Sequence, residues 1–325
     1  MDERPVRQEA DESRAGSRRP PAALRGGIST EAAFLWGFAC LALVLAVWYL
    51  ATAPLFPVPV TDVAEAPLER TSVPLVSPVM LPGPGAVFEA VPDVFARRRL
   101  LANTLVTLKR VALGFGLAAL IGVPLGVAAA CFPAVRAFLY PVTIFGRNIP
   151  VAALIPLTFF LFGIGEFQKV MFLFVASVAF VISDATAAVL EVPQRYVDTA
   201  LTLGASRLQI ILKVLAPLAA PAIFNSLRLL FGLAFGYVML AELVKFGTDS
   251  GGLGDLINVS QRRGEREPIL IVLIVIPLIA YAIDRALWWL QCDLFPYRYG
   301  GRGRLKRLLH RILHPPPAIR TEFRP

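Results

Sequence analysis

The chain has 325 residues, of which 56% are hydrophobic and 17% are Asp, Glu, Lys or Arg. Soluble domains typically have about 45–50% apolar and about 25% charged residues, so this composition excludes a soluble globular protein and predicts an all-α polytopic membrane protein. The formal net charge of +9 would also fit a nucleic-acid-binding protein. The arginines gather near the two termini, however, which membrane orientation explains better, so no nucleic-acid partner is expected.

The cysteines and histidines give no sign of a metal centre. Cys40, Cys131 and Cys292 lie far apart, in or beside apolar runs, and this predicts neither a disulfide framework nor a metal cluster. His310 and His314 have a spacing that fits a zinc pair on a helix, but both lie in a basic tail, where a solvated basic helix is the simpler interpretation. We expect no metal and no cofactor.

The chain begins with a polar segment followed by an apolar one. Residues 1–30 are rich in Arg, Glu, Pro and Ala without an apolar period, which predicts a disordered cytoplasmic tail. Residues 31–51 predict the first transmembrane helix, with tryptophans near both ends as in interfacial aromatic belts. The Ala-Thr-Ala sequence that follows resembles a signal-peptidase site, so a cleaved leader is the alternative. The apolar run, however, exceeds the usual leader core of about 7–15 residues.

A long connection precedes the main transmembrane region. Residues 52–100 are rich in proline and predict an irregular external connection, and residues 101–295 predict the main transmembrane domain. Residues 111–132 carry no charge and are long enough for the second span. Gly122 and Gly126 form a Gly-x3-Gly pair in this span, which fits either generic helix packing or a seam between two copies of the chain.

The next two spans contain ionisable residues. Residues 138–164 predict a third span that is broken near Arg147 and Pro150. Arg147 either faces the translocation path and favours anions, or is an interfacial anchor. Residues 170–190 predict the fourth span, and Asp184 within it is either a functional group or an interfacial one.

Residues 192–217 are polar and amphipathic, although both flanks are strongly apolar. Pro193 suits the start of a helix, and Gly204 suits a left-handed residue that ends it. Ser206 and Gln209 have the spacing of a capping box that begins a second helix. The segment therefore predicts a helix, a tight turn and a second helix at the membrane surface.

The remaining chain predicts two more spans, residues 218–240 and residues 269–290, followed by a basic cytoplasmic tail at 296–325. Further candidates for a translocation path, besides Arg147, are Asn225, Ser226 and Glu242.

The distribution of Lys and Arg predicts the orientation. With six spans and the 192–217 loop inside, these residues are more numerous on the side of the two tails, so both termini are expected in the cytoplasm. Lys109 and Arg110 count as external charges in this scheme. The run from Arg97 to Arg99 also lies outside, where we expect a surface helix ahead of the second span.

The polar loop resembles a known motif. The membrane subunits of binding-protein-dependent ABC importers carry a cytoplasmic loop that reads Glu-Ala-Ala-x3-Gly-x9-Ile-x-Leu-Pro. The matching positions are Asp198, Thr199, Ala200, Gly204, Val214, Ala216 and Pro217. Only Ala200, Gly204 and Pro217 keep the residue of the motif, and on this stretch alone an ordinary interfacial hairpin is the alternative.

Three longer stretches carry a closer resemblance. LPGPGAVFEAV (81–91), LLANTLVTLKRVALGFGLAALIGVPLGV (100–127) and RNIPVAALIPLTFFLFGIGE (147–166) are similar to permeases of the nitrate, sulfonate and taurine type. The resemblance implies a six-helix type I ABC importer permease fold with a cytoplasmic coupling helix. It also implies a bacterial inner-membrane location, small anions as substrates, and Asp198, Thr199, Ala200, Gly204 and Pro217 as the positions that couple to the ATPase.

The implied partners are cytoplasmic ATP-binding subunits, an external solute-binding protein, a second permease copy in a homodimer, and membrane lipid. The sequence contains no Gly-x4-Gly-Lys-Ser/Thr loop, so ATP hydrolysis is expected from a partner chain, and no catalytic set points to an enzyme. A secondary transporter or channel is the alternative, although such proteins usually carry mid-membrane acids in two corresponding halves. A scaffold that only binds other subunits would not need a broken third span.

Overall fold

The computed structural model describes residues 29–54, 56–59, 70–77, 80–244 and 251–299. The predicted N-terminal tail and most of the predicted C-terminal tail therefore lie outside the described residues. The chain divides into two compact units, Met1–Pro84 and Gly85–Pro325, and each is described by itself.

The first unit contains the predicted first span. Helix α2 (Thr30–Thr52) begins after Ser29, whose hydroxyl accepts a hydrogen bond from the Ala32 amide at 3.2 Å. The helix is long and apolar enough to cross a membrane, as the sequence predicts.

The connection after α2 is more regular than expected. Strand β1 (Phe56–Pro59) pairs antiparallel with β2 (Arg70–Val73), so the prediction of an irregular segment was wrong here. Proline is compatible with such a ribbon because each strand has an open edge where no donor is needed. Near the end of the unit, the Trp48 indole Nε1 donates to the Pro82 carbonyl oxygen at 3.1 Å.

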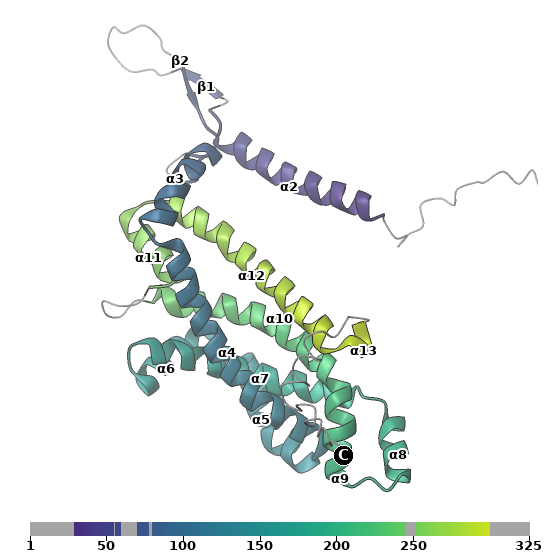
Figure 1. Ribbon diagram of the computed structural model, residues 1–325. Coiled ribbons are helices and arrows are strands. Elements are labelled where there is room, and N and C mark those ends of the chain that lie inside the picture. The colour runs from purple at the N-terminus through teal and green to yellow at the C-terminus, as the bar shows by residue number, and fades with distance from the viewer. Residues whose placement is uncertain (1–28, 55, 60–69, 78–79, 245–250, 300–325) are drawn as a thin grey trace, which may run out of the picture. The chain divides into compact units, whose positions relative to one another are not determined.

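The second unit is built of helices and short connections (Figure 1). Its elements are α3 (Pro84–Ala96), α4 (Leu100–Cys131), α5 (Pro133–Asn148), α6 (Val151–Phe162), α7 (Glu166–Leu190), α8 (Gln194–Thr202), α9 (Arg207–Ile210), the π-helical turn η1 (Ile211–Leu215), α10 (Ala216–Leu243), α11 (Leu253–Arg263), α12 (Glu267–Leu294) and α13 (Pro296–Tyr299). Within the described ranges, five helices of the chain are long and apolar enough to span a membrane, and six spans result when the bent pair α5–α6 counts as one.

The second span starts earlier than the sequence predicts. Helix α4 begins at Leu100 rather than near residue 111, and the helix expected ahead of it is present as α3, which ends just before the arginine run. The first turns of α4 are polar because they hold a neighbouring loop. The Asn103 side-chain oxygen accepts from the Gly252 amide, and the Thr107 hydroxyl accepts from the Leu253 amide, both at 2.9 Å.

The third span is broken, as predicted. Helices α5 and α6 meet at an angle of 111°. Ile149 lies at the break with extended backbone angles, φ −68° and ψ 127°, because the ring of Pro150 disfavours a helical conformation for the residue before it.

Helices α4 and α7 pack closely along a row of small residues. A Cβ atom added to Gly114 would lie 2.6 Å from the Leu173 Cβ atom, and one added to Gly126 would lie 2.6 Å from the Ala185 Cβ atom. Gly122 contacts the same helix, with an added Cβ at 2.7 Å from Val181. Gly122 and Gly126 therefore allow close packing of α4 on α7 within one chain. They do not form a seam between two copies of the chain.

Candidate functional site

The 192–217 loop contains a short exposed helix that ends in a defined turn. Helix α8 follows Pro193, and Gly204 has φ +77° in the left-handed region. The Gly204 amide donates to the Leu201 carbonyl at 2.9 Å, and the Ala205 amide donates to the Ala200 carbonyl at 3.0 Å. These two bonds are the Schellman motif, which explains why the alanine and the glycine of the sequence motif lie four residues apart.

The second half of the loop is held by the predicted capping box. The Ser206 hydroxyl accepts from the Gln209 amide at 3.4 Å, and the Gln209 side-chain oxygen accepts from the Ser206 amide at 2.9 Å. Helix α9 then continues through η1 into α10. Residues Arg207–Leu243 therefore form one continuous apolar helix, so the second helix of the loop and the fifth span are a single element.

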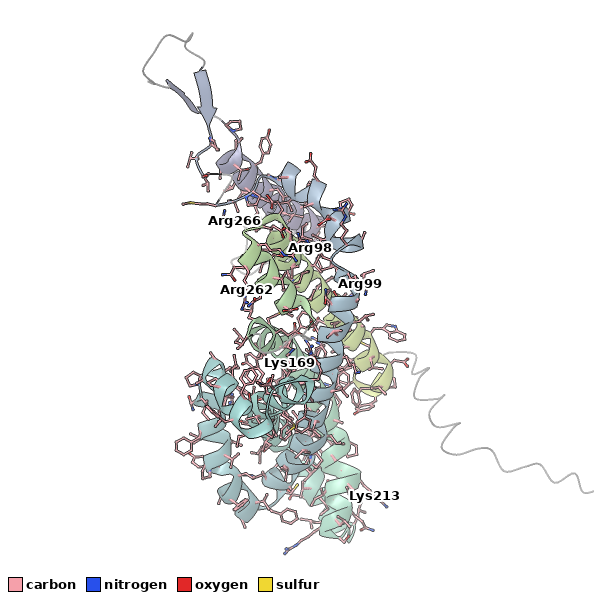
Figure 2. All side chains as sticks on the ribbon, turned by 90° about the vertical axis from the view of Figure 1, so that its left-hand side faces the viewer. Arg98, Arg99, Lys169, Lys213, Arg262 and Arg266 are labelled. Carbon is pink, nitrogen blue, oxygen red and sulfur yellow. The ribbon has the colours of Figure 1, made fainter. Side chains whose placement is uncertain are left out.

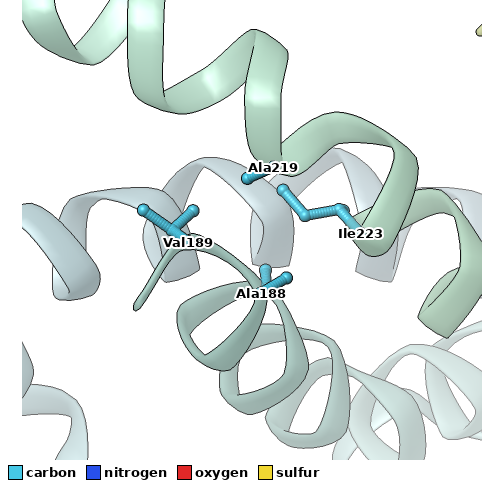
Figure 3. Packing of buried hydrophobic residues seen from close by; sticks show 5 residues of the cluster. Ala188, Val189, Ala219 and Ile223 are labelled. Atoms are coloured by element: carbon cyan, nitrogen blue, oxygen red, sulfur yellow. The ribbon is translucent and has the colours of Figure 1, made fainter. Parts of the chain in front are cut away.

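The two ends of the loop pack against each other where they join the fourth and fifth spans. Figure 3 shows Ala188 and Val189 at the end of α7 packed against Ala219 and Ile223 at the start of α10. All four side chains are at least nine-tenths buried. A displacement of the loop therefore acts on the fourth and fifth spans together.

The outer surface of the loop is exposed. Asp198 and Thr199 are solvent-exposed, while Ala200 is buried against the loop itself. The Asp198 carboxylate accepts from the Gln194 side-chain amide at 3.2 Å, and the Thr199 hydroxyl donates to the Arg195 carbonyl at 2.7 Å. Large apolar side chains are exposed beside them: Leu201, Leu203, Leu208 and Leu212. An exposed surface of this mixed composition, at one end of the second unit (Figure 1), is suited to docking of a partner protein.

Pro217, the last position of the motif, lies at the start of α10 and is exposed. Its carbonyl oxygen accepts a hydrogen bond from the Tyr297 hydroxyl at 2.9 Å. The loop thus ends where the segment after the last span meets the fifth span.

Arg147 lies in the last turn of α5 and borders a cavity of about 600 Å³ between α5 and α7. Its guanidinium donates to the Ser183 hydroxyl at 2.5 Å, lies 3.9 Å from the Asp184 carboxylate, and stands over the Phe180 ring at 5.3 Å. Polar side chains are frequent in the lining of this cavity, which includes Arg136, Thr143, Asn148, Ser183 and Thr186. The two candidate ionisable residues of the third and fourth spans are therefore brought together.

The other path candidates lie away from this cavity. Asn225 and Ser226 are half-buried on α10, one turn before Arg228, whose Nε atom lies 2.9 Å from the Asp284 carboxylate of α12. Glu242 is 0% exposed, so in this structure its side chain does not line an open path.

Glu242 instead belongs to a buried ionic cluster. One of its oxygens lies 2.6 Å from Arg110 Nη1, and the other accepts from the Gly254 amide at 2.9 Å. The Thr107 hydroxyl donates to the same carboxylate at 2.9 Å. Arg110 also makes a bidentate pair with Glu166 at the start of α7, with the Nε–Oε2 distance at 2.7 Å. The cluster joins α4, α7, α10 and the first turn of α11, and Arg110 also donates to the Gly251 carbonyl in the loop before α11 at 2.8 Å.

Arg110, which the orientation scheme counts among the charges on the external side, is only 2% exposed, and the sequence analysis did not predict that it would be buried. Lys169 near the start of α7 is also buried, at 5% exposed. The sequence contained one sign of this ionic cluster. Two acids, Glu166 and Glu242, lie at the ends of apolar spans and need buried cationic partners.

The chain belongs to the family described as "Binding-protein-dependent transport system inner membrane component", which matches residues 122–291. It is 33% identical over 228 residues to the taurine transport system permease protein TauC of Escherichia coli, covering 69% of this chain and 82% of TauC. It is 30% identical over 192 residues to the bicarbonate transport system permease protein CmpB of Synechococcus elongatus, covering 59% of this chain and 68% of CmpB. These relatives confirm the predicted resemblance.

A solved structure described as an amino acid ABC transporter with histidines has the same fold, with a TM-score of 0.54 at 17% identity over 62% of this chain and 96% of that one. The predicted all-α, six-span fold of a type I ABC importer permease is confirmed. The chain is a multi-pass membrane protein and a transport component, the permease subunit of an ABC importer.

Proposed function

We propose that the chain forms the translocation path for a small anion in an ATP-driven importer, and that its 192–217 loop couples this path to a cytoplasmic ATPase. The observation that carries the proposal is the exposed helix α8 of the loop. A Schellman turn and a capping box fix its geometry, and the ends of the loop pack together where they join α7 and α10. Such a loop transmits the movement of a docked partner to two spans.

ATP hydrolysis belongs to the partner in this proposal. The sequence has no loop of the Gly-x4-Gly-Lys-Ser/Thr type, so phosphates would be bound by separate ATP-binding subunits. Asp198 and Thr199 supply exposed polar groups for docking, and the neighbouring leucines supply apolar contact area. Ala200, Gly204 and Pro217 act indirectly, because they define the turn and the end of the loop.

The first prediction concerns Gly204. A Cβ atom there would meet nothing within 4 Å, so the obstacle to substitution is the backbone alone, at φ +77°. Valine at this position disfavours the left-handed backbone conformation by about 1 kcal/mol or more. The substitution Gly204→Val therefore tilts α8 away from α9. We expect the variant to reach the membrane but to lose copurification of the ATP-binding subunit and substrate-stimulated ATP hydrolysis.

Gly204→Asn is the matched control, because asparagine tolerates the left-handed region better than other residues with a Cβ atom. It should keep most of the ATPase association. If Gly204→Val copurifies the ATP-binding subunit as well as the parent chain does, the loop is an interfacial hairpin and the coupling proposal fails.

A small anion is the proposed substrate class. Two arginines, Arg136 and Arg147, border the cavity between α5 and α7, together with hydroxyl and amide groups that can accept or donate hydrogen bonds. The relatives named for taurine and bicarbonate transport point to the same chemistry. An external solute-binding protein would deliver the anion, as the family arrangement implies.

The second prediction concerns Arg147. Arg147→Gln removes the cavity's charge next to Asp184 while retaining a hydrogen-bond donor for Ser183. We expect uptake to fall by roughly tenfold, which corresponds to about 1.4 kcal/mol of lost interaction. The measurement is uptake of labelled taurine and bicarbonate into cells that contain equal amounts of each variant.

Arg147→Lys keeps the charge without the planar guanidinium and should retain more uptake than Arg147→Gln. Uptake that is equal in Arg147→Gln and the parent chain would show that Arg147 is an interfacial anchor.

The proposed orientation places both termini and the 192–217 loop in the cytoplasm of a bacterial cell with the chain in its inner membrane. Figure 2 shows that Arg98, Arg99, Arg262 and Arg266 lie toward one end of the second unit, whereas Lys213 of the loop lies at the opposite end. The four arginines are residues that the orientation scheme assigns to the external side, and Lys213 is one that it assigns to the cytoplasmic side, so the two groups lie at opposite ends as that scheme expects. A second copy of the chain and membrane lipid would cover the exposed apolar faces, with the copies forming a homodimer.

The alternative of a secondary transporter is not favoured. Such proteins need acids that are free to bind coupling ions. Glu166 and Glu242 are both paired with Arg110, and Asp184 lies beside Arg147.

A further inference from the structure

Two prolines interrupt the hydrogen bonds at the start of α10. Pro221 has no amide hydrogen, so the Pro217 carbonyl four residues earlier lacks its usual helical donor. Pro217 itself cannot donate to the Lys213 carbonyl, and the π-helical turn η1 occupies the turn before it, with the Ala216 amide donating to Ile211. Prolines and π-helical turns are the common causes of kinks in helices.

The end of α12 and the segment after it supply donors at this interruption. The Tyr297 hydroxyl donates to the Pro217 carbonyl at 2.9 Å, and the Gln291 side-chain amide donates to the Pro221 carbonyl at 3.2 Å. Both donors come from the C-terminal end of the described chain, and both acceptors come from the first turns of α10. The sequence separations are 80 and 70 residues.

Gln291 is held in position by further contacts. It is 1% exposed, its oxygen accepts from Arg228 Nη1 at 3.2 Å, and its nitrogen also lies 3.0 Å from the Tyr299 hydroxyl. Phe295 packs edge-on against Phe224 of α10 with ring centroids 5.9 Å apart. The contact is therefore built from several groups and is not a single surface bond.

We propose that Gln291, Tyr297 and Tyr299 form a C-terminal clamp, a set of positioning residues that fixes the start of α10 and with it the direction of the 192–217 loop. Tyr297 supplies the donor that Pro221 withholds from the Pro217 carbonyl, and Gln291 adds a second contact one turn further along α10. The clamp also joins the sixth span to the start of the fifth, next to the 192–217 loop. Its role in transport rests on the proposed coupling function of that loop.

The clamp can be tested without knowledge of the transported anion. Tyr297→Phe removes the donor but keeps the ring that packs against Phe295 at a centroid distance of 6.1 Å. The measurement is hydrogen–deuterium exchange of the full chain in lipid nanodiscs, followed in peptides that cover residues 207–220. Loss of one hydrogen bond should speed exchange there by about fivefold, with exchange in the α4–α7 seam unchanged.

Tyr281→Phe is the matched control, because it makes the same change of side chain on α12, the helix that carries Gln291, at a position that is 68% exposed. It should leave exchange in 207–220 unchanged. Gln291→Met, which keeps the volume but removes both polar groups, should speed the same peptides at least as much as Tyr297→Phe.

A second variant tests the cause. Pro221→Ala restores an amide hydrogen four residues after Pro217, so the helix can satisfy that carbonyl by itself. In the Pro221→Ala background, Tyr297→Phe should therefore have little further effect on exchange. Equal effects of Tyr297→Phe in both backgrounds would show that the hydroxyl does not compensate for the proline.

Unchanged exchange in 207–220 on Tyr297→Phe, in the presence of Pro221, would overturn the clamp. This outcome differs from failure of the coupling proposal, which Gly204→Val and copurification of the ATP-binding subunit test separately. In the complex, Tyr297→Phe should keep the ATP-binding subunit bound but lower the ratio of stimulated to basal ATP hydrolysis by about threefold to fivefold. A clamp that only stabilised the fold would leave that ratio unchanged.

Discussion

Arg110→Met is expected to lower the free energy of unfolding by about 3–5 kcal/mol, since it removes the cationic partner of the buried Glu242 carboxylate. Glu242 is 0% exposed and lies 2.6 Å from the Arg110 guanidinium. Without Arg110 its carboxylate would keep only the Thr107 hydroxyl and the Gly254 amide. The measurements are the yield of folded chain after extraction and its thermal midpoint.

Lys109→Met is the matched control, because Lys109 is the adjacent residue and is exposed. It should leave both measurements nearly unchanged. The double substitution Arg110→Met with Glu242→Gln should recover part of the lost stability, because glutamine carries no charge. A stable Arg110→Met chain would show that the buried cluster contributes little to the fold.

Gly126→Leu is expected to separate α4 from α7 and to destabilise the chain by about 3 kcal/mol, at the upper end of the typical cost of overpacking. An added Cβ would lie 2.6 Å from the Ala185 Cβ atom and 2.7 Å from the Ile182 carbonyl oxygen, and the second of these is backbone that cannot rotate away. Thermal unfolding of the purified chain in detergent measures the effect.

Gly116→Leu provides the comparison on the same helix. Gly116 is exposed, and a Cβ atom there would meet nothing within 4 Å. The same change of side chain should therefore be neutral or slightly stabilising, since leucine has a better helix propensity than glycine. If Gly126→Leu and Gly116→Leu lowered the thermal stability of the chain equally, close packing of α4 on α7 would not require the row of small residues.

The parts of the structure that the sequence predicted well depend on short-range interactions. The turn at Gly204 and the capping box of Ser206 and Gln209 involve donors and acceptors no more than five residues apart. The break at Pro150 is equally local. For such features the residue type and its spacing contain almost all the physical information, and the predictions were confirmed.

Features that depend on distant contacts were missed. Arg110 meets Glu166 across 56 residues and Glu242 across 132 residues, and no local pattern reveals which charges will pair. The charge of Arg110 entered the sequence analysis only through the count of Lys and Arg on each side of the membrane. The small-residue spacing of Gly122 and Gly126 was visible, but the spacing does not identify the facing helix, and the structure shows that this helix is α7.

The continuity of the loop with the fifth span has a mechanical consequence. Arg207–Leu243 is 37 residues long, or about 55 Å at about 1.5 Å per residue, whereas the hydrocarbon layer is about 30 Å thick. Some 25 Å of this helix therefore extends beyond the hydrocarbon as a lever arm. A tilt of roughly 10° about a fulcrum at the membrane surface would move the tip of such an arm by about 4 Å. When the bonds from Gln291 and Tyr297 hold the proline-interrupted start of α10, a small rotation at the loop end becomes a displacement of the opposite end of the same helix, where Glu242 joins α4 and α7 through Arg110.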